Sequence, residues 1–525
     1  MFYGLKGGKY YQSLKIITFT ICAMYILFNL FSMGAVNAYA AGEGKNTISV
    51  DGDIHLKDGW ILDSGEKNYV KVDKSYADDY DTDFYAEISS NYKNSYNSED
   101  TALKIDTAKK LAAFSKFIND GYSFYGKYAS LTSDINLDES SNGIEYKLIE
   151  DGEKESVTIV MSGSVSHSWN PIGFGNNKFD GTFIGNNHTI TNMFFKQRGN
   201  ATGLFGKVGS NGIVKDINVK RATVSGSITG GIAGENNGTI SGCTNSGFVG
   251  STGNDLLVGH ILIYSKAGGI VGDNRGTIIN CENNGAVSSY FSTAAFTLGN
   301  CFQAGGIVGD NKGTINGCGN SGAVSLGFFA TNAVFTSSIP SNAGGIAGES
   351  KGTISGCENS GTISPYVSAT NYSTTCDANS GGIVGKNKGK ISNCKNSGEI
   401  FAYAFSDSIY YFAYSNAGGI VGLQDDGSIL DCLSVSRSIG GNSSSFGGIA
   451  GRCGSRVSIK NCYYDKNVVC GDIGGAINGS DCIENNVKGL STSELKSKDD
   501  LFSSGSIWLI KYGNYPVLDR ISIGK

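Results

Sequence analysis

The sequence contains little proline, little histidine and few charged side chains. Of its 525 residues, 4 are Pro, 4 are His, and 17% are Asp, Glu, Lys or Arg. The shortage of proline excludes collagen and Pro-rich stalks, because both need that residue in quantity. No H-E-x-x-H pair is present, so the zinc ligands and general base of a metalloprotease are missing.

Other signatures of chemistry are also scarce. Neither a P-loop nor a C-x-x-C pair occurs, and we expect no serine nucleophile elbow of the G-x-S-x-G type. Acidic residues between Gly230 and Val435 are few and sit mostly at turn positions, so no paired-carboxylate glycosidase site is evident. No basic block interleaved with aromatics is present, which argues against nucleic acid as a partner. We expect no cofactor, no metal and no enzymatic activity.

Glycine and aromatic residues are abundant. Glycine makes up 76 of 525 residues, about 14%, against a usual share of about 7%. The chain also has 26 Phe, 27 Tyr and 40% apolar residues, which is enough to bury a core and excludes wholesale disorder. The composition therefore predicts a folded chain built around obligatory glycines.

The first 40 residues have the order of a secretory signal peptide. Lys6, Lys9 and Lys15 precede an apolar stretch over 16–36, and Ala38-Tyr39-Ala40 matches a cleavage site. An uncleaved membrane anchor is the alternative, because the stretch is long enough to span a bilayer. Without residues 1–40, 39 basic and 47 acidic side chains remain, a net charge of −8. Either interpretation predicts an extracellular protein, secreted or attached to the cell surface.

A repeat organises most of the chain. The block Gly-Gly-Ile-(Val/Ala)-Gly begins at Gly230, Gly268, Gly305, Gly344, Gly381, Gly418 and Gly447, mostly 37 to 39 residues apart. The fullest copy, 305–324, reads GGIVGDNKGTINGCGNSGAV. Short apolar segments separated by Gly, Asn and Ser predict strands and sharp corners, where Gly and Asn tolerate positive φ. One copy is too small to close a core, so the copies must stack.

The predicted fold is all-β, a right-handed parallel β-helix of about 37-residue repeats. Equivalent residues of successive coils would stack about 4.8 Å apart. The sequence leaves open whether each repeat forms one coil or two.

The repeated pattern also resembles the GLUG motif of bacterial surface proteins, including non-catalytic regions of some immunoglobulin A proteases. The segment 169–190 (WNPIGF…DGTFIGNNHTI) resembles the opening coil before such motifs, and Trp508 with Tyr515–Leu518 is similar to the closing segment. The resemblance covers roughly residues 105–518. It implies a secreted or cell-surface β-helix used in adhesion or host contact, and it fixes no ligand.

The remaining segments flank the repeats. We divide the chain into a signal peptide (1–40), a polar accessory or linker region (41–104), an N-terminal cap (105–168), opening coils (169–229), seven repeats (230–486) and a C-terminal cap (487–525). A helix is predicted over 106–119, with Asp106 as its N-cap, and would cover the open end of the β-helix. The acidic run Asp78–Asp83 is interpreted as a solvated loop rather than a calcium loop, which its spacing does not complete.

Seven cysteines share one position in the repeat. We predict that they stack as a buried, mostly reduced ladder, because in-register parallel side chains have poor geometry for bridging. Disulfides are the alternative for an exported chain, and Cys453, Cys470 and Cys482 are the better candidates for them. The ladder comprises Cys243, Cys281, Cys318, Cys357, Cys394, Cys432 and Cys462.

The variable segments between motifs carry most of the candidate binding residues. The last one, 401–416, could be a hairpin of two alternating strands. Alternatively, it is a second solenoid coil whose aromatics stack on their equivalents one repeat away, Phe328, Phe329 and Phe335. In the functional interpretation its rings form a ridge for sugars or a protein partner. The candidate residues are Phe401, Tyr403, Phe405, Tyr410, Tyr411, Phe412 and Tyr414.

These observations favour a non-catalytic adhesion module that binds a glycan or protein at a cell surface. Two alternatives stay open. One is a β-helix carbohydrate-active enzyme, a lyase or hydrolase with scattered Asp, Lys and Arg, and the other is a passive structural spacer. A membrane contact is expected only if the signal segment stays uncleaved.

Overall fold

A computed structural model describes the chain over residues 61–63, 69–138, 144–151, 156–197, 199–252, 264–293, 301–331, 339–370, 375–406, 413–436, 439–441, 445–454, 457–468, 482–498, 501–502 and 507–519. The predicted signal peptide and Cys470 lie outside the described residues.

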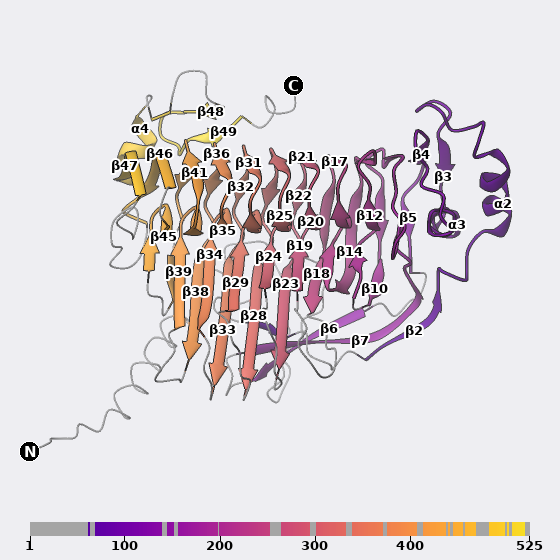
Figure 1. Ribbon diagram of the computed structural model, residues 1–525, viewed down its shortest axis with the longest axis horizontal. Coiled ribbons are helices and arrows are strands. Elements are labelled where there is room, and N and C mark those ends of the chain that lie inside the picture. The colour runs from indigo at the N-terminus through magenta and orange to yellow at the C-terminus, as the bar shows by residue number, and fades with distance from the viewer. Residues whose placement is uncertain are drawn as a thin grey trace, which may run out of the picture.

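The described chain forms a parallel β-helix whose coils stack along the long axis of Figure 1. Two of its three main sheets hold one strand from each coil. The return sheet comprises β11 (Ala201–Thr202), β15 (Ile228–Gly230), β19 (Tyr264–Gly268), β24 (Cys301–Gly305), β29 (Ile339–Gly344), β34 (Cys376–Gly381), β39 (Ala413–Gly418) and β44 (Ser445–Gly447). The middle sheet comprises β12 (Phe205–Val208), β16 (Ala233–Asn236), β20 (Val271–Asn274), β25 (Val308–Asn311), β30 (Ala347–Ser350), β35 (Val384–Asn387), β40 (Val421–Gln424) and β45 (Ala450–Cys453).

The third sheet, the long sheet, holds 27 strands in the described part of the chain. Most coils cross it as two or three short strands in succession. They are β3 (Leu103–Ile105), β4 (Tyr128–Leu131), β5 (Ile135–Asn136), β8 (Thr182–Ile184), β9 (Thr189–Thr191), β10 (Phe194–Lys196), β13 (Ile213–Lys215), β14 (Asn218–Gly226), β17 (Thr239–Ser241), β18 (Thr244–Thr252), β21 (Thr277–Ile279), β22 (Glu282–Asn283), β23 (Val287–Thr293), β26 (Thr314–Asn316), β27 (Gly319–Asn320), β28 (Val324–Thr331), β31 (Thr353–Ser355), β32 (Glu358–Asn359), β33 (Ile363–Thr370), β36 (Lys390–Ser392), β37 (Lys395–Asn396), β38 (Ile400–Ser406), β41 (Gly427–Leu430), β42 (Leu433–Ser434), β43 (Ile439–Gly441), β46 (Val457–Asp465) and β47 (Cys482–Leu490).

Each repeat is one coil. Ile278 pairs with Ile315, and Ile315 pairs with Ile354, so equivalent residues of successive repeats are direct neighbours across the sheet. The alternative of two coils per repeat, which the sequence left open, is therefore wrong. The β-helix fold itself is confirmed, and the ladder cysteines and motif isoleucines together form its buried centre.

The three glycines of the motif are required by close approach, not by backbone conformation. In the copy at Gly305, a Cβ on Gly305 would collide with the Val308 carbonyl oxygen, and one on Gly306 with the Asn320 side chain. A Cβ on Gly309 would lie 2.7 Å from the Gly272 oxygen and 3.1 Å from the Ala267 nitrogen of the return sheet. All three have ordinary φ, so the expectation of positive φ is wrong for this block.

Positive φ occurs instead at the residue before each ladder cysteine. All seven residues there have φ between 50° and 66°, in the left-handed region that Gly, Asn and Asp tolerate best. The corner turns the chain between two strands of the long sheet, and only these three residue types occupy it. They are Gly242, Asn280, Gly317, Gly356, Asn393, Asp431 and Asn461.

Stacked asparagines tie neighbouring coils together. Asn320 Nδ2 donates to Asn359 Oδ1 at 2.8 Å and to the Gly322 oxygen, while its own Oδ1 accepts from Asn283 Nδ2 at 2.8 Å. The same three bonds recur at Asn283 and Asn359. Each buried amide is thus satisfied only when the next coil carries a partner in register.

The variable segments between motifs form a fin that projects from the rod. In Figure 1 the long strands β23, β28, β33 and β38 extend past the other coils, and β24, β29, β34 and β39 lead the chain back. Outgoing and returning strands belong to different sheets, so the hairpin interpretation is wrong. The two layers enclose an apolar core, in which the Phe302 ring lies 5.5 Å from Phe291 and 5.1 Å from Phe328.

A helical cap covers the first coils. α3 (Ala108–Asn119) places Phe114 against Phe124 and Phe183, at ring distances of 5.0 and 5.8 Å. The helix begins after Thr107, whose hydroxyl accepts from Lys110 N, so Asp106 is not the N-cap. Asp106 instead pairs with Lys110 at 2.9 Å.

Part of the region expected to be an accessory or linker segment is folded into this cap. α2 (Thr82–Asn91) buries Phe84 and Ile88 in the same core as α3. A separate small sheet joins β1 (Ile61–Asp63), β2 (Tyr69–Ser75) and β6 (Ile144–Asp151) to β7 (Ser156–Ser168). Its strand β1 lies against β28 of the fin. The sequence predicts a strand over 68–72, which β2 matches. Neither α2 nor the other strands of this sheet were expected.

The far end of the rod has its own small core. α4 (Thr492–Ser497) and the strand pair β48 (Trp508–Leu509) and β49 (Val517–Leu518) pack on the last coils. The rings of Phe502 and Trp508 stack at 4.3 Å, and Trp508 Nε1 donates to the Asp431 oxygen.

We predict that breaking one step of the asparagine ladder destabilises the rod. Asn320→Ala removes the inter-coil hydrogen bonds of Asn283 Nδ2 and Asn359 Oδ1. Each atom keeps only a bond within its own coil, to Gly285 O and from Gly361 N, and the two lost bonds should cost about 2 kcal/mol. The control Ser321→Ala removes only an exposed bond to Asn284 and should cost less than about 0.5 kcal/mol. Denaturant midpoints measure both, and equal midpoints for the two variants would contradict the ladder's role.

Candidate functional site

The outer face of the fin collects aromatic side chains on its long strands. In β38 the side chains alternate, with Ala402 and Ala404 buried in the fin and Phe401, Tyr403 and Phe405 turned outward. Phe405 is 46% exposed, unusually high for a phenylalanine. The Phe401 and Tyr403 rings lie 6.5 Å apart at 13°. The structure therefore brings three of the predicted candidate residues side by side onto one surface.

In-register pairing extends this face to the neighbouring coils. Tyr403 pairs with Tyr366, and their rings are 6.3 Å apart. Tyr366 pairs with Gly327, which pairs with Tyr290, so the row continues across β33, β28 and β23. Because the return sheet covers the inner face, β1 must cross the outer face where it lies against β28. The strand β38 lies beyond that crossing.

The other candidate aromatics do not share this position. Tyr414 lies on β39 in the return sheet, on the opposite layer of the fin, with the Arg452 guanidinium 5.8 Å from its ring. Grouping it with Phe401 and Tyr403 was wrong, because the intervening chain changes sheets. Tyr410, Tyr411 and Phe412 lie outside the described residues, as does Phe335. Phe328 is fully buried in the fin core, where its ring contacts Phe291 and Phe302. In register it aligns with Val367 and then with Ala404, so it is not an aromatic of β38 that lies over it.

A buried ionic cluster lies where the return and middle sheets meet. Lys266 Nζ contacts Asp273 at 2.5 Å and Asp310 at 2.7 Å, and Lys312 contacts the same two carboxylates at 3.3 and 2.7 Å. Burial disfavours the charged forms of Lys266 and Asp310. The two neighbouring aspartates nevertheless raise the pKa of Lys266, and Lys266 in turn lowers the pKa of Asp310. Two cations thus neutralise two anions, and the cluster links coils rather than presenting an acid and a base.

The letters G-E-S-K-G at 348–352 match the elbow pattern that we did not expect in the sequence. Their structural context differs from that of a nucleophile elbow. Ser350 ends β30, is fully buried, and its hydroxyl accepts from Asn311 Nδ2 at 3.2 Å. The next element is the strand β31, not a helix, so Ser350 is a member of the polar ladder.

The acidic run 78–83, at the start of α2, is only partly a solvated loop, because Asp79 and Asp81 have specific partners. Asp79 contacts Lys109 at 2.7 Å, His167 at 2.9 Å and Lys74 at 3.2 Å. The hydrogen bonds from Lys109 and His167 hold the pKa of Asp79 far below its usual range. Asp81 caps α2 by accepting from Phe84 N at 2.9 Å. The described residues contain no group of three or more His, Cys, Asp or Glu side chains placed to share a metal ion.

The ladder cysteines are buried thiols. Each Sγ contacts the carbonyl oxygen two residues earlier, at 3.2 to 3.5 Å. Burial raises the pKa of the Cys318 thiol, which keeps it protonated. All described cysteines are free in the structure, and the thiols of Cys453 and Cys482, both partly exposed, contact each other.

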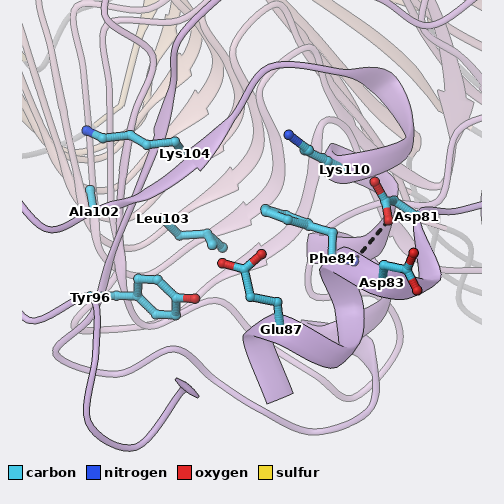
Figure 2. A pocket seen from close by; sticks show the side chains of 9 residues that line it. All are labelled: Asp81, Asp83, Phe84, Glu87, Tyr96, Ala102, Leu103, Lys104 and Lys110. Carbon is cyan, nitrogen blue, oxygen red and sulfur yellow. Dashed lines mark hydrogen bonds between the residues drawn. The ribbon is translucent and has the colours of Figure 1, made fainter. Parts of the chain in front are cut away.

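A cavity of about 530 Å³ lies in the N-terminal cap, between α2, β3 and the start of α3 (Figure 2). Sequence reasoning missed it, because its walls come from segments 81–87, 96, 102–104 and 110, which share no motif. The lining residues are Asp81, Asp83, Phe84, Glu87, Tyr96, Ala102, Leu103, Lys104 and Lys110.

Comparisons with known proteins cover only parts of the chain. No family model matches it. A stretch of 134 residues, 24% of this chain and 1% of the relative, is 34% identical to "Halomucin" of Haloquadratum walsbyi. A stretch of 77 residues, 14% of this chain and 9% of the relative, is 39% identical to "Putative Gly-rich membrane protein" of Evansella cellulosilytica. The chain thus spans less than a tenth of either relative.

One similar solved structure is the crystal structure of "a putative immunoglobulin A1 protease" from Bacteroides ovatus. It is 18% identical, with a TM-score of 0.35 over 81% of this chain and 94% of that chain. Among the described residues, no helix combines the length and apolar character needed to cross a membrane.

We predict that the seven ladder thiols of the native protein resist alkylation by iodoacetamide, because all seven side chains are fully buried and out of reach of the reagent. After unfolding in guanidinium without reductant, all seven should react, as mass spectrometry of the peptides would show. Ladder cysteines that stay unmodified even after unfolding would instead be in disulfides, which would contradict a reduced ladder.

We further predict that Asp79→Asn weakens the cap in a pH-dependent way. The folded pKa of Asp79 is depressed, so its ionised form stabilises the fold above the unfolded value of about 4. That contribution is lost as pH falls through the folded pKa. Near neutral pH the loss should be about 1 kcal/mol after solvent screening.

The control for this variant is Asp78→Asn, which changes an exposed neighbour. Thermal unfolding followed across the acid range should show the two variants converging only well below about pH 4. A difference that disappears already above that pH would contradict the salt-bridge network around Asp79.

Proposed function

We propose that this protein is a non-catalytic β-solenoid of the cell surface or extracellular space that binds a glycan or protein through the outer face of the fin. The observation that carries the proposal is the outward row of Phe401, Tyr403 and Phe405 on β38. Soluble proteins rarely leave neighbouring aromatics in contact with water unless a partner covers them. Similarity to a halomucin and to a Gly-rich membrane protein supports a location at the cell surface.

The fin is suited to binding because its rings are held in place before a partner arrives. In-register pairing to β33 positions Tyr403 beside Tyr366, and the apolar core beneath fixes the strands. A preorganised aromatic face loses little conformational entropy on binding, and each ring can contribute about 1 kcal/mol of stacking. Sugar rings and flat peptide surfaces both present the apolar faces that such stacking needs.

The buried carboxylates of the repeats do not favour the alternative of a carbohydrate-active enzyme. Two of the buried carboxylates in the repeats, Asp273 and Asp310, are neutralised by Lys266 and Lys312. A glycosidase needs one carboxyl group that carries a proton and one that does not, placed across an open cleft. The passive spacer remains the competing proposal, and binding measurements decide between them.

We predict that replacing Phe401, Tyr403 and Phe405 together by Ser lowers affinity for glycan-array or host-cell targets about a hundredfold. Three lost stacking contacts of about 1 kcal/mol each give that factor. The control Tyr512→Ser removes an aromatic that is 83% exposed at the far end of the rod, and should leave binding unchanged. Circular dichroism should show the same β content in all variants.

Two results would contradict this proposal. Binding that survives the triple substitution would place the contact elsewhere on the molecule. A wild-type protein that binds none of the glycan or cell targets would instead favour the spacer.

A further inference from the structure

The cavity in the N-terminal cap is remote in sequence from the aromatic strand β38. Its lining combines charged and apolar side chains, whereas the outer face of β38 is aromatic. Its polar walls are the acidic side of α2, with Asp83 and Glu87, and the lysines of β3 and α3. Its apolar floor consists of Phe84, Ala102 and Leu103. Its volume of about 530 Å³ falls in the range of natural small-ligand sites.

A buried hydroxyl without a bond faces this cavity. Tyr96 is only 8% exposed, yet its Oη makes no hydrogen bond of normal geometry among the described residues; the Asn91 side chain lies near enough to lower its pKa slightly. The Tyr96 ring is fixed by stacking on Phe124 at 6.1 Å. Its backbone is held at φ 63°, a left-handed conformation uncommon for a residue with a side chain. Strained residues of this kind cluster at binding sites.

Glu87 supplies the complementary group. Figure 2 shows the Glu87 carboxylate and the Tyr96 hydroxyl pointing toward the same space from opposite walls. Burial, with the Glu87 charge as a second cause, raises the pKa of Tyr96, so the hydroxyl keeps its proton. The cavity therefore presents one donor that lacks an acceptor and one acceptor that is open to solvent.

The two lysines at the rim already have partners. Lys104 Nζ donates to Ser130 Oγ at 3.2 Å. Lys110 pairs with Asp106 at 2.9 Å and lies over the Phe84 ring at 5.4 Å. The positive charge of Lys110 is thus partly neutralised by its ion pair. The acidic side chains Asp81, Asp83 and Glu87 offset the remaining positive charge of the two lysines. A simple anion gains little from such a balanced wall.

We propose that the cavity binds a saccharide unit, with Tyr96 donating to a sugar oxygen and Glu87 accepting from a neighbouring sugar hydroxyl. A hydroxyl group both accepts and donates, so a vicinal diol satisfies Tyr96 and Glu87 together. An ammonium group only donates and would leave the buried Tyr96 proton without an acceptor. The apolar floor contacts the carbon face of the sugar. This site goes beyond the role of the fin and does not depend on it.

The test uses saturation-transfer difference NMR on the full chain. The probes are galactose, N-acetylglucosamine, glucuronic acid and N-acetylneuraminic acid, with Nα-acetyl-lysine amide and inorganic phosphate as comparison ligands. At least one sugar should show saturable transfer. Tyr96→Phe keeps the ring that stacks on Phe124 and loses only the hydroxyl, so the affinity should fall about tenfold. Glu87→Gln should weaken binding to a similar extent.

Matched controls separate this site from others. Tyr125→Phe removes a hydroxyl from a tyrosine that is 63% exposed and does not line the cavity, so it should leave the affinity unchanged. The triple variant of the fin should also leave it unchanged, which keeps the two proposals independent. No transfer from any of the four sugars would overturn the proposal. Undiminished transfer in both Tyr96→Phe and Glu87→Gln would do so too, as would binding of the lysine or phosphate probe alone.

Discussion

The structure depends on one constraint, that each coil must place the same side chain directly over its equivalent in the previous coil. The buried Asn283, Asn320 and Asn359 show why, because each donates one hydrogen bond forward and accepts one from behind. An insertion or deletion inside the motif would leave every later amide facing the wrong neighbour. Register is therefore kept within the motif, and variation in length falls in the fin and, in the last two repeats, in the turn between the middle and long sheets before Cys432 and Cys462.

The glycine content follows from the same constraint, although for two separate reasons. At the corner before each ladder cysteine the chain needs positive φ, and Gly317 is interchangeable there with Asn280 or Asp431. In the Gly-Gly-Ile-Val-Gly block the backbone is ordinary, and side chains are excluded because neighbouring sheets touch at Gly309. Asn can replace Gly in the first case but not in the second, which explains why that block is nearly invariant along the chain.

The repeat could be predicted from the sequence because its residues recur, and recurrence reveals which positions are buried. The β-helix and the buried cysteine position were accessible in this way, whereas the cap helix was predicted from its own local sequence. The positions of Tyr414 and Tyr96 could not be predicted. Tyr414 is near Phe405 in sequence, but the chain changes sheets between them, and no local pattern marks that change. Tyr96 faces its cavity because of a single left-handed residue in a segment with no repeat, so periodicity carried no information about it.

The motif residues of the rod and the variable strands of the fin are under different structural constraints. Residues inside the motif are fixed by stacking and can hardly change, whereas strands of the fin need only keep their inward side chains, such as Ile363 and Ile400, in register. Their outward positions are then free to vary. The outward side chains are nevertheless aligned from coil to coil, because the inward side chains and the motif set the register. Tyr366 and Tyr403 are neighbours for this reason. On such a surface, equivalent side chains recur at the inter-strand spacing of about 4.8 Å. An extended partner would therefore contact several coils at once. Affinity can then arise from many weak contacts, which suits a rigid scaffold with few charged side chains.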